Sequence, residues 1–304
     1  MLRAFTYHQP VTVQEACELL AYYEGNVRPY AGGTSLLTLM KQGLFHVENL
    51  VNLKRLADLR TIEKEGDGTL TIGALVTHRA LELSPLIHEY LPLLSEVEHE
   101  LANVRVRAAG TIGGSLAFAE AQSDPPTVLA ALGAEVRLQS ARGERWVSLD
   151  EFYVDYYETV TAPDEILTHV RIPAAPPRGG AAYVKFCNRG RSDKPTVGVM
   201  VALMRSMPSG STTAAETRSP ARSGWEACIM LGAVGPTPIR AVQAEACLIA
   251  EGLTPTGLRA AAAAVAESAR PVDDLYGSAA YKRAMARVMA RRALERAMQR
   301  AGLA

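Results

Sequence analysis

The sequence predicts a mixed α+β fold divided into two domains. The larger first part alternates short apolar strands and hairpins with helical segments, whereas the last part places three strands before three helices. The chain of 304 residues is long enough for two domains, and 48% hydrophobic with 21% charged residues supports an ordinary core. Prolines and glycines gather between residues 173 and 180, where we place the boundary between domains 1–176 and 177–304.

The elements of the first domain follow from apolar spacing, caps and turn residues. Thr12 precedes apolar residues spaced three and four apart, which predicts a helix over 12–23 with Thr12 as its N-cap. Gly66-Asp-Gly68 separates two apolar runs, 59–63 and 69–73, and predicts a hairpin. Asp124, followed by two prolines, predicts the N-cap of a helix that ends at Gly133. The other expected elements are strands at 27–30, 49–53 and 166–172, a hairpin over 135–139 and 145–148, and helices at 36–41, from 77 and over 91–102.

The second domain is predicted to contain strands and then helices. Its first segments are rich in Val, Met and aromatic residues, which favour strands, and the later ones have the apolar spacing of amphipathic helices. The polar segment 206–224 separates two of the strands, and its composition predicts an exposed loop. The expected strands are 182–187, 197–205 and 225–231, and the expected helices are 241–251, 256–268 and 278–300.

Two short glycine motifs share one pattern. Ala31-Gly-Gly-Thr-Ser35 and Thr111-Ile-Gly-Gly-Ser115 each place a glycine pair before a small hydroxyl residue. Glycine lets the backbone approach a ligand closely, and successive N–H groups in such turns bind anions. Ser35 is also placed to cap the helix that follows, which would direct a helix N-terminus at the same anion. A single glycine pair is usually an ordinary turn, but two such motifs predict a grip on two phosphates, as in a dinucleotide.

Charge and motif content exclude several functions. Lys plus Arg and Asp plus Glu number 32 each, so the chain lacks the basic footprint of a nucleic-acid-binding protein. The sequence contains no Walker A motif and no Gly-x-Gly-x-x-Gly, and its six histidines lack metal-binding or nucleophile-activating spacing. We therefore expect no catalytic and no metal-ligating residues in this chain. That pattern indicates a protein whose reactivity belongs to a bound cofactor.

Cysteine usage and the amino terminus indicate a cytoplasmic protein. The four cysteines are scattered and form no Cys-x-x-Cys pair, as is usual in a reducing compartment. The opening residues lack the apolar core of a signal peptide, and no apolar run reaches membrane-spanning length. We expect a cytoplasmic location without a membrane span.

The two glycine motifs closely resemble the FAD loops of the medium, FAD-binding subunit of molybdenum hydroxylases, the xanthine dehydrogenase family. The likeness runs along almost the whole chain and is greatest to the carbon monoxide dehydrogenase branch. The further shared motifs are Phe5-x-Tyr-His-x-Pro10, Asn103-x-x-x-Arg107-x-x-Gly110, Asp124-x-Pro126, Leu167-x-x-Val-Arg-Ile-Pro173 and Tyr281-Lys-x-x-Met285. Their shared order along the chain makes the resemblance specific.

This resemblance implies a fold and a set of partners. It implies an FAD-binding fold of the PCMH type, with two α+β subdomains over about 1–57 and 58–176, followed by a smaller α+β flavoprotein carboxy-terminal domain. Members of the family join a large molybdopterin subunit and a small subunit with two [2Fe–2S] clusters, often as a doubled heterotrimer. Electrons would pass from those clusters through FAD to a final acceptor.

The resemblance also implies site residues, position by position. Asp124 matches a carboxylate that contacts the cofactor's hydroxyl groups, and Lys185 matches a basic residue near the flavin ring. Leu167 and Leu101 match apolar residues that line the ring. Thr34 stands where related oxidases with covalent flavin carry histidine, so the implied FAD is non-covalent. The residues that would wrap the pyrophosphate and ribityl chain are Pro29, Tyr30, Ala31, Gly32, Gly33, Thr34, Ser35, Leu36, Thr111, Ile112, Gly113, Gly114 and Ser115.

Two other functions remain open on the sequence alone. One is a free-standing FAD-dependent oxidoreductase of the same fold, which would need a substrate pocket and an acid–base set of its own. The other is a non-catalytic nucleotide-binding scaffold. A flavin chromophore on the purified chain would exclude the scaffold, and co-purification with molybdenum and iron–sulfur subunits would exclude the free-standing enzyme.

Overall fold

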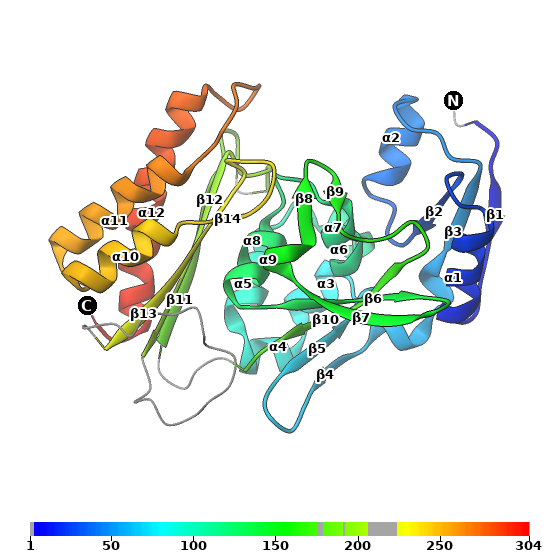
Figure 1. The fold of residues 1–304 in the computed structure, drawn as a ribbon, viewed down its shortest axis with the longest axis horizontal. Coiled ribbons are helices and arrows are strands. Elements are labelled where there is room, and N and C mark those ends of the chain that lie inside the picture. Colours follow the sequence, from blue (N-terminus) through cyan, green and yellow to red (C-terminus); the bar gives the residue numbers. More distant parts are fainter. Residues whose placement is uncertain (1–2, 175–178, 191, 206–223, 304) are drawn as a thin grey trace. The chain divides into compact units, whose positions relative to one another are not determined.

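The computed structural model describes residues 3–174, 179–190, 192–205 and 224–303 (Figure 1). The chain forms two compact units, one of residues 1–120 and 133–174 and the other of residues 121–132 and 175–304. The sequence places residues 121–132 in the first domain, whereas in the structure this segment packs against strands of the second unit. The linker prolines Pro176 and Pro177, and residues 206–223 of the predicted loop, lie outside the described residues.

The first unit begins with a three-stranded parallel sheet. Its strand order is β1 (Thr6–His8), β3 (Asn49–Asn52) and β2 (Val27–Tyr30). Helix α1 (Val13–Tyr22) confirms the predicted helix, because the Thr12 side chain accepts the Glu15 N–H at 3.1 Å. The helix buries Ala16, Cys17 and Leu20 in a cluster with residues of β2 and β3. Helix α2 (Leu36–Gln42) follows the first glycine motif and confirms the predicted helix at 36–41, with Gly43 as its C-cap.

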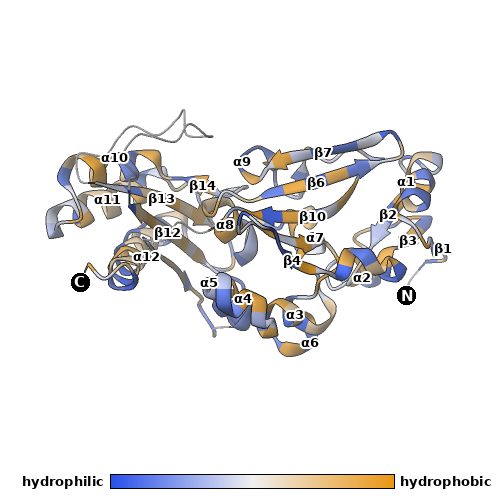
Figure 2. Cartoon of the chain, turned by 90° about the horizontal axis from the view of Figure 1, so that it is seen from below, coloured by the Kyte–Doolittle hydropathy of each residue, from blue (hydrophilic) through white to orange (hydrophobic). Residues whose placement is uncertain are grey.

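The first unit also contains a five-stranded antiparallel sheet. Alternate residues of β6 are buried and half-buried, which is the period of a strand with one covered face. Figure 2 shows both hydrophobic and hydrophilic residues along this strand. The predicted hairpins are confirmed, but β4 starts only at Ile62 because the preceding residues, Ala57–Arg60, form a 3-10 helix. The strand order is β4 (Ile62–Lys64), β5 (Leu70–Gly73), β10 (Ile166–Ile172), β6 (Glu135–Ser140) and β7 (Gly143–Ser148).

Short helices connect these strands. The predicted helix 91–102 is shorter, as α5, and two further helices, α6 and α7, follow in a stretch for which the sequence analysis predicts no helix. Asn103 caps α6 and Thr111 caps α7 through their side chains, so the second glycine motif forms the first turn of a helix and not a loop. The helices are α3 (His78–Leu83), α4 (Pro85–Tyr90), α5 (Pro92–Glu100), α6 (Val104–Ala109), α7 (Ile112–Phe118) and α9 (Leu149–Phe152). The remaining elements of this unit are a 3-10 helix (Leu53–Arg55) and a small ladder of β8 (Tyr153–Asp155) and β9 (Glu158–Thr159).

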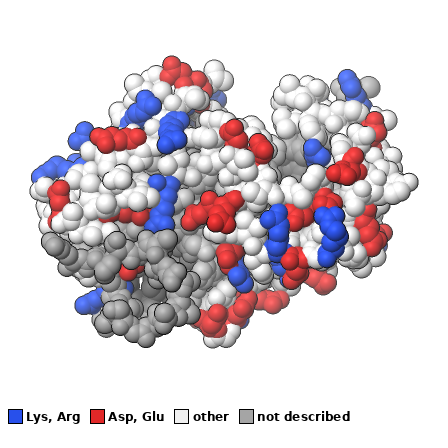
Figure 3. Space-filling model, in the orientation of Figure 1, with Lys and Arg blue, Asp and Glu red and all other residues white. Residues whose placement is uncertain are grey.

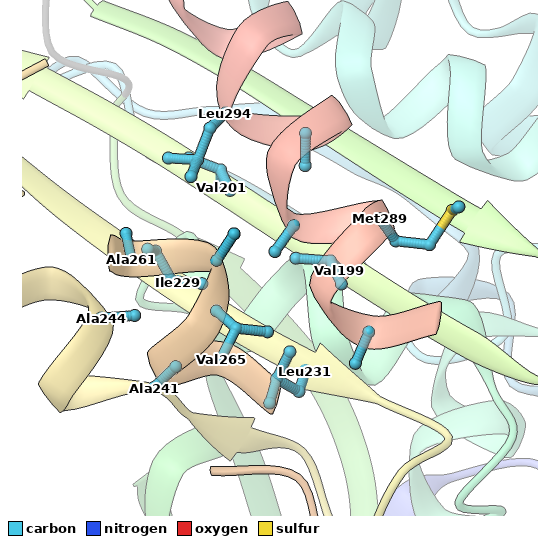
Figure 4. Packing of buried hydrophobic residues seen from close by; sticks show 14 of the residues in the cluster. Val199, Val201, Ile229, Leu231, Ala241, Ala244, Ala261, Val265, Met289 and Leu294 are labelled. Atoms are coloured by element: carbon cyan, nitrogen blue, oxygen red, sulfur yellow. The ribbon is translucent and has the colours of Figure 1, made fainter. Parts of the chain in front are cut away.

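In its described residues, the second unit has a four-stranded antiparallel sheet and four helices. Val199 and Val201 of β12 pack with Met289 and Leu294 of α12 in one apolar cluster (Figure 4). The predicted strands and helices are confirmed, and the structure adds the two-residue strand β14. The sheet order is β11 (Gly179–Phe186), β12 (Val197–Arg205), β13 (Trp225–Gly232) and β14 (Ile239–Arg240). The helices are α8 (Asp124–Ala131), α10 (Val242–Glu251), α11 (Pro255–Ser268) and α12 (Ala279–Arg300).

The described residues show neither a large surface patch of one charge on the face drawn in Figure 3 nor a helix apolar enough to span a membrane. Acidic and basic side chains are interspersed on the face drawn in Figure 3, as the formal net charge of zero leads one to expect. Within the described ranges, no helix has the length and apolar character needed to cross a bilayer.

Candidate functional site

The two glycine motifs lie against each other in the first unit. A Cβ placed on Gly32 would lie 2.1 Å from the carbonyl oxygen of Ala109 and 2.8 Å from the Cα of Gly110. A Cβ placed on Gly114 would lie 3.9 Å from the Cβ of Ala31. Backbone can approach backbone this closely only where side chains are absent. Two segments far apart in the sequence therefore form one glycine-lined surface.

The first motif presents free backbone donors. In the described parts of the chain, the N–H groups of residues 32–36 have no hydrogen-bond acceptor. Gly33 adopts a positive φ of 71°, and its carbonyl accepts the Leu37 N–H at 3.1 Å to begin α2. Consecutive free amides at a glycine turn form an anion-binding concavity. The chemistry of this donor set fits a phosphate group.

Ser35 does not cap α2 through its side chain, so that sequence prediction is wrong. Its backbone is already helical, with φ −94° and ψ −53°, and its hydroxyl makes no capping hydrogen bond. A side-chain cap requires an extended residue, whose hydroxyl can turn back toward the helix amides. The consequence is that no side chain competes for the amides of the first motif.

The second motif has the amides of residues 112–115 engaged within the protein. Ile112 N–H donates to the Val76 carbonyl and Gly113 N–H to the Ala74 carbonyl, both at 3.0 Å. The Thr111 hydroxyl accepts the Gly114 N–H at 3.1 Å, and the Thr111 carbonyl accepts the Ser115 N–H at 2.9 Å. The two motifs are alike in sequence and different in structure. The first motif has free N–H donors at residues 32–36, whereas in the second motif the N–H groups of residues 112–115 are hydrogen-bonded within the protein, and this motif forms a packed wall next to the first.

A charge network around the buried Glu82 joins helices α3, α5 and α6, which precede the second motif in the chain. Glu82 of α3 accepts hydrogen bonds from Arg79, His99 and Arg107, with the Arg107 Nε at 2.9 Å. Burial disfavours the charged carboxylate, but these three donors outweigh it and lower the pKa of Glu82 to about 2. Arg107 also donates to the carbonyls of Leu101 and Ala102 at 2.9 and 3.0 Å. It thereby holds the turn in which Ala102 adopts a positive φ of 44°.

The second unit brings Asp124 and Lys185 together. The Lys185 Nζ lies 2.9 Å from Asp124 Oδ2, and both side chains are about nineteen-twentieths buried. The Tyr183 hydroxyl donates to the other oxygen, Oδ1, at 2.6 Å. A Cβ on Gly198 would lie 2.3 Å from that hydroxyl, so glycine is what lets Tyr183 reach the carboxylate. Asp124 is the first residue of α8 and Ser123 precedes it as the N-cap, so the predicted cap at Asp124 is wrong.

Tyr183 is a contributor that the sequence reasoning missed. It stands two residues before Lys185 on β11, and alternate residues of a strand face the same side. This two-residue spacing is the signal in the sequence that could have identified Tyr183 as a neighbour of Lys185. Cross-strand register gives Gly198 opposite Lys185 and confirms that these residues share a face.

The remaining predicted residues take separate positions. Pro29 and Tyr30 end β2, and Lys54 Nζ lies 4.1 Å from the centre of the Tyr30 ring. Leu167 is buried on β10 at an irregularity in the pairing with β6. Leu101 is half-buried at the end of α5. In the described residues, no three His, Cys, Asp or Glu side chains are arranged to hold a metal ion. Cys17, Cys187, Cys228 and Cys247 form no disulfide.

The fold and the glycine surface together fit a class of protein in which backbone amides hold an anionic group. Comparison with known proteins gives the family. Residues 3–175 match the family described as "FAD binding domain in molybdopterin dehydrogenase", and residues 210–297 match "CO dehydrogenase flavoprotein C-terminal domain". The chain belongs to the FAD-binding medium subunits of the molybdopterin hydroxylases.

Individual relatives extend over nearly the whole chain. The carbon monoxide dehydrogenase medium chain of Hydrogenophaga pseudoflava is 34% identical over 93% of both chains. The nicotine 6-hydroxylase medium subunit of Paenarthrobacter nicotinovorans is 34% identical over 93% of this chain and 94% of its own. A solved structure of carbon monoxide dehydrogenase from H. pseudoflava superposes with a TM-score of 0.89 at 36% identity, covering 99% of each chain. The predicted family and fold are confirmed, whereas relatives with different substrates are equally similar.

Proposed function

We propose that this chain is the electron-transferring FAD subunit of a carbon monoxide dehydrogenase-like molybdenum hydroxylase complex. The observation that carries the proposal is the run of free amides at residues 32–36, packed against a second glycine motif. Each charge-assisted hydrogen bond from such an amide to a phosphate stabilises the complex by roughly 1.5–3 kcal/mol. A few of them suffice for tight binding without a catalytic side chain.

The two motifs would divide the work of holding FAD. The segment Pro29 to Leu36 would wrap the diphosphate, with the N–H groups of residues 32–36 as its donors, and Thr111 to Ser115 would form the wall against which it lies. Leu101 and Leu167 would line the ring, as the resemblance implies. Asp124 and Lys185 would contribute their hydrogen-bonded pair to the cofactor's hydroxyl groups and ring.

Non-covalent binding is part of the proposal. Thr34 provides no imidazole for a bond to the flavin, and its carbonyl accepts the Thr38 hydroxyl at 2.7 Å within the first turn of α2. The flavin should therefore leave the protein on denaturation.

The partners in the proposed complex are a large molybdopterin subunit and a small subunit with two [2Fe–2S] clusters, together a doubled heterotrimer in the cytoplasm. When bound, FAD would take electrons from those clusters and pass them to a final acceptor. The relatives are named as medium chains or subunits, which supports an assembly of this kind.

Purification of the tagged chain from its native host tests the proposal. We expect an oxidised-flavin absorption spectrum, release of intact FAD by acid, and co-purification of molybdenum and iron. A colourless chain that takes up no FAD would overturn the proposal. A yellow chain that purifies alone and reduces a substrate by itself would instead support the free-standing oxidoreductase.

A further inference from the structure

Helix α12 of the second unit carries a concentrated positive charge. Its 22 residues include seven basic side chains and one acidic side chain, so the helix has a formal net charge of +6. Because the whole chain has a formal net charge of zero, the rest of the chain carries −6. The charge of this protein is therefore unevenly distributed along the sequence, and α12 holds a large basic excess.

Most of these basic side chains lie on the face of α12 that points away from the core. The opposite face packs Met289 and Leu294 against strand β12 (Figure 4). Lys282 is the exception among the basic residues, because it is 2% exposed and its Nζ lies 2.6 Å from Asp274. The exposed basic residues are all arginines, namely Arg283, Arg287, Arg291, Arg292, Arg296 and Arg300.

Three of the exposed arginines have no counter-charge. Within the described parts of the chain, the side chains of Arg287, Arg292 and Arg296 form no ion pair and no hydrogen bond. The other three are engaged, Arg291 with the one acidic side chain of the helix, Glu295, at 3.5 Å. An unpaired guanidinium keeps all five of its N–H donors, in a planar fork that matches a carboxylate. The outward face of α12 therefore has carboxylate-binding groups without carboxylates.

Apolar and aromatic side chains lie between the arginines. Residues three or four apart are neighbours on a helix surface, so the arginines form one row in the amino-terminal half of α12 and a second row in its carboxy-terminal half. Around the helix, Tyr281 and Val288, which are 43% and 37% exposed, lie between the two rows. Arginine and tyrosine are enriched at protein–protein interfaces, so this composition favours a protein partner.

Nucleic acid and membrane fit this face less well than an acidic protein surface does. The chain has no net charge, so an extended polyanion gains no long-range attraction to it. The apolar face of α12 is part of the core of the second unit, so the helix has no apolar face to insert into a bilayer. A compact acidic surface needs only the arginines themselves, each of which can bind a carboxylate through two hydrogen bonds.

We infer that the exposed arginine face of α12 is a docking surface for an acidic surface on a partner subunit of the complex. The inference rests on the proposed function and adds the place at which this chain meets a partner. Arg287, Arg292 and Arg296 bind carboxylates of the partner, and Tyr281 and Val288 pack against its apolar side chains.

The test is rebinding of the full chain to the large and small subunits of the complex from which this chain has been removed. Arg287→Gln/Arg292→Gln/Arg296→Gln should raise the Kd for these subunits about tenfold or more, because charge-assisted pairs are lost. Raising NaCl from about 50 to about 300 mM should weaken wild-type binding more steeply than binding of the triple variant, since salt screens charge pairs. Biolayer interferometry with the immobilised chain measures both effects. Glutamine is a good helix former, so α12 should persist.

The matched control removes the same charge from exposed positions outside α12, as Arg3→Gln/Arg55→Gln/Arg259→Gln. This control variant should bind the two subunits with the wild-type Kd and the wild-type salt dependence. Circular dichroism melts of both triple variants should match that of the wild-type chain, which separates loss of docking from loss of folding.

Two results would count against the docking surface. One is a wild-type Kd with wild-type salt dependence in the α12 triple variant, and loss of binding to a DNA duplex or to phosphatidylserine vesicles in that variant would then assign the face to a polyanion or a membrane. The other is an equal loss of affinity in the control variant, which would mean that only the overall charge matters. A wild-type chain that does not bind the large and small subunits would instead contradict the proposed function itself.

Discussion

The carbonyl oxygen of Ala109 lies 2.1 Å from the position that a Cβ on Gly32 would occupy. Two non-bonded heavy atoms do not approach so closely, so any side chain at residue 32 must push the two glycine motifs apart. The Ala109 carbonyl cannot move aside at a low energetic cost, because it is part of the backbone.

Gly32→Ala should therefore abolish retention of flavin, while the chain still folds. The measurement is the ratio of flavin to protein absorbance after gel filtration. Gly66→Ala is the matched control, since a Cβ there meets nothing within 4 Å. Equal flavin content in the two variants would contradict the placement of the cofactor at this surface.

Gly33→Val should also lose flavin, for a different reason. Gly33 has a φ of 71°, a region that β-branched residues do not tolerate, and its Cβ would lie 2.3 Å from the Tyr30 ring. Gly43→Val shares the positive φ, at 73°, but faces open space, so it should cost stability and keep flavin. Flavin titration of both apo-variants distinguishes the two effects. Retention of flavin by Gly33→Val would argue that this turn does not face the ligand.

Arg107→Met should destabilise the first unit by about 3 kcal/mol, because it removes one of three partners from a buried carboxylate. Urea denaturation followed by circular dichroism measures the change. Adding Glu82→Gln should restore part of the loss, since the uncompensated charge disappears. If the double variant were less stable than Arg107→Met, the charge would not be the cause.

Stability should fall in acid in a way that depends on Glu82. The folded-state pKa of Glu82 is lowered from 4.5 to about 2, so its contribution is complete above pH 4.5 and is lost as pH falls toward 2. In Glu82→Gln, the unfolding free energy should change less with pH across that window. Chemical denaturation at pH 5, 4 and 3 compares the slopes. Parallel slopes would mean that Glu82 is not perturbed by folding.

Tyr183→Phe should weaken the second unit by about 1.5 kcal/mol or more, because it removes a hydrogen bond to a buried, charged Asp124. Gly198→Ala should have a similar effect, since its Cβ would displace the same hydroxyl. Tyr22→Phe, on a side chain that is 80% exposed, should be neutral. Thermal denaturation of the three variants is the measurement, and an unchanged Tyr183→Phe would show that the bond contributes nothing.

Local signals in the sequence predicted much of this fold. The cap at Thr12, the hairpin around Gly66–Gly68 and the helix at 36–41 depend on residues within a few positions of each other, and each is found as expected. The second glycine motif was misread as a loop because glycine is a poor helix former. Helix α7 exists there because Thr111 caps it and the backbone of residues 74–76 accepts its first amides, contacts that periodicity does not reveal.

The chemistry of the site was less predictable than its location. The near-identity of the two motifs concealed that the amides of Ile112 and Gly113 are engaged, since that depends on where Val76 and Ala74 lie. The Lys185–Asp124 pair joins residues 61 positions apart, and the His78–Glu98 pair joins two helices. Sequence spacing alone could not bring either pair together.

The excursion of residues 121–132 constrains how such a protein can be altered. The chain leaves the first unit after residue 120, returns at 133 and departs again after 174. A single cut at the predicted boundary would strip the carboxy-terminal fragment of α8, together with the carboxylate that neutralises Lys185. Neither fragment can then be replaced alone by the corresponding fragment of a relative. A chimaera should fold only when both fragments come from the same protein.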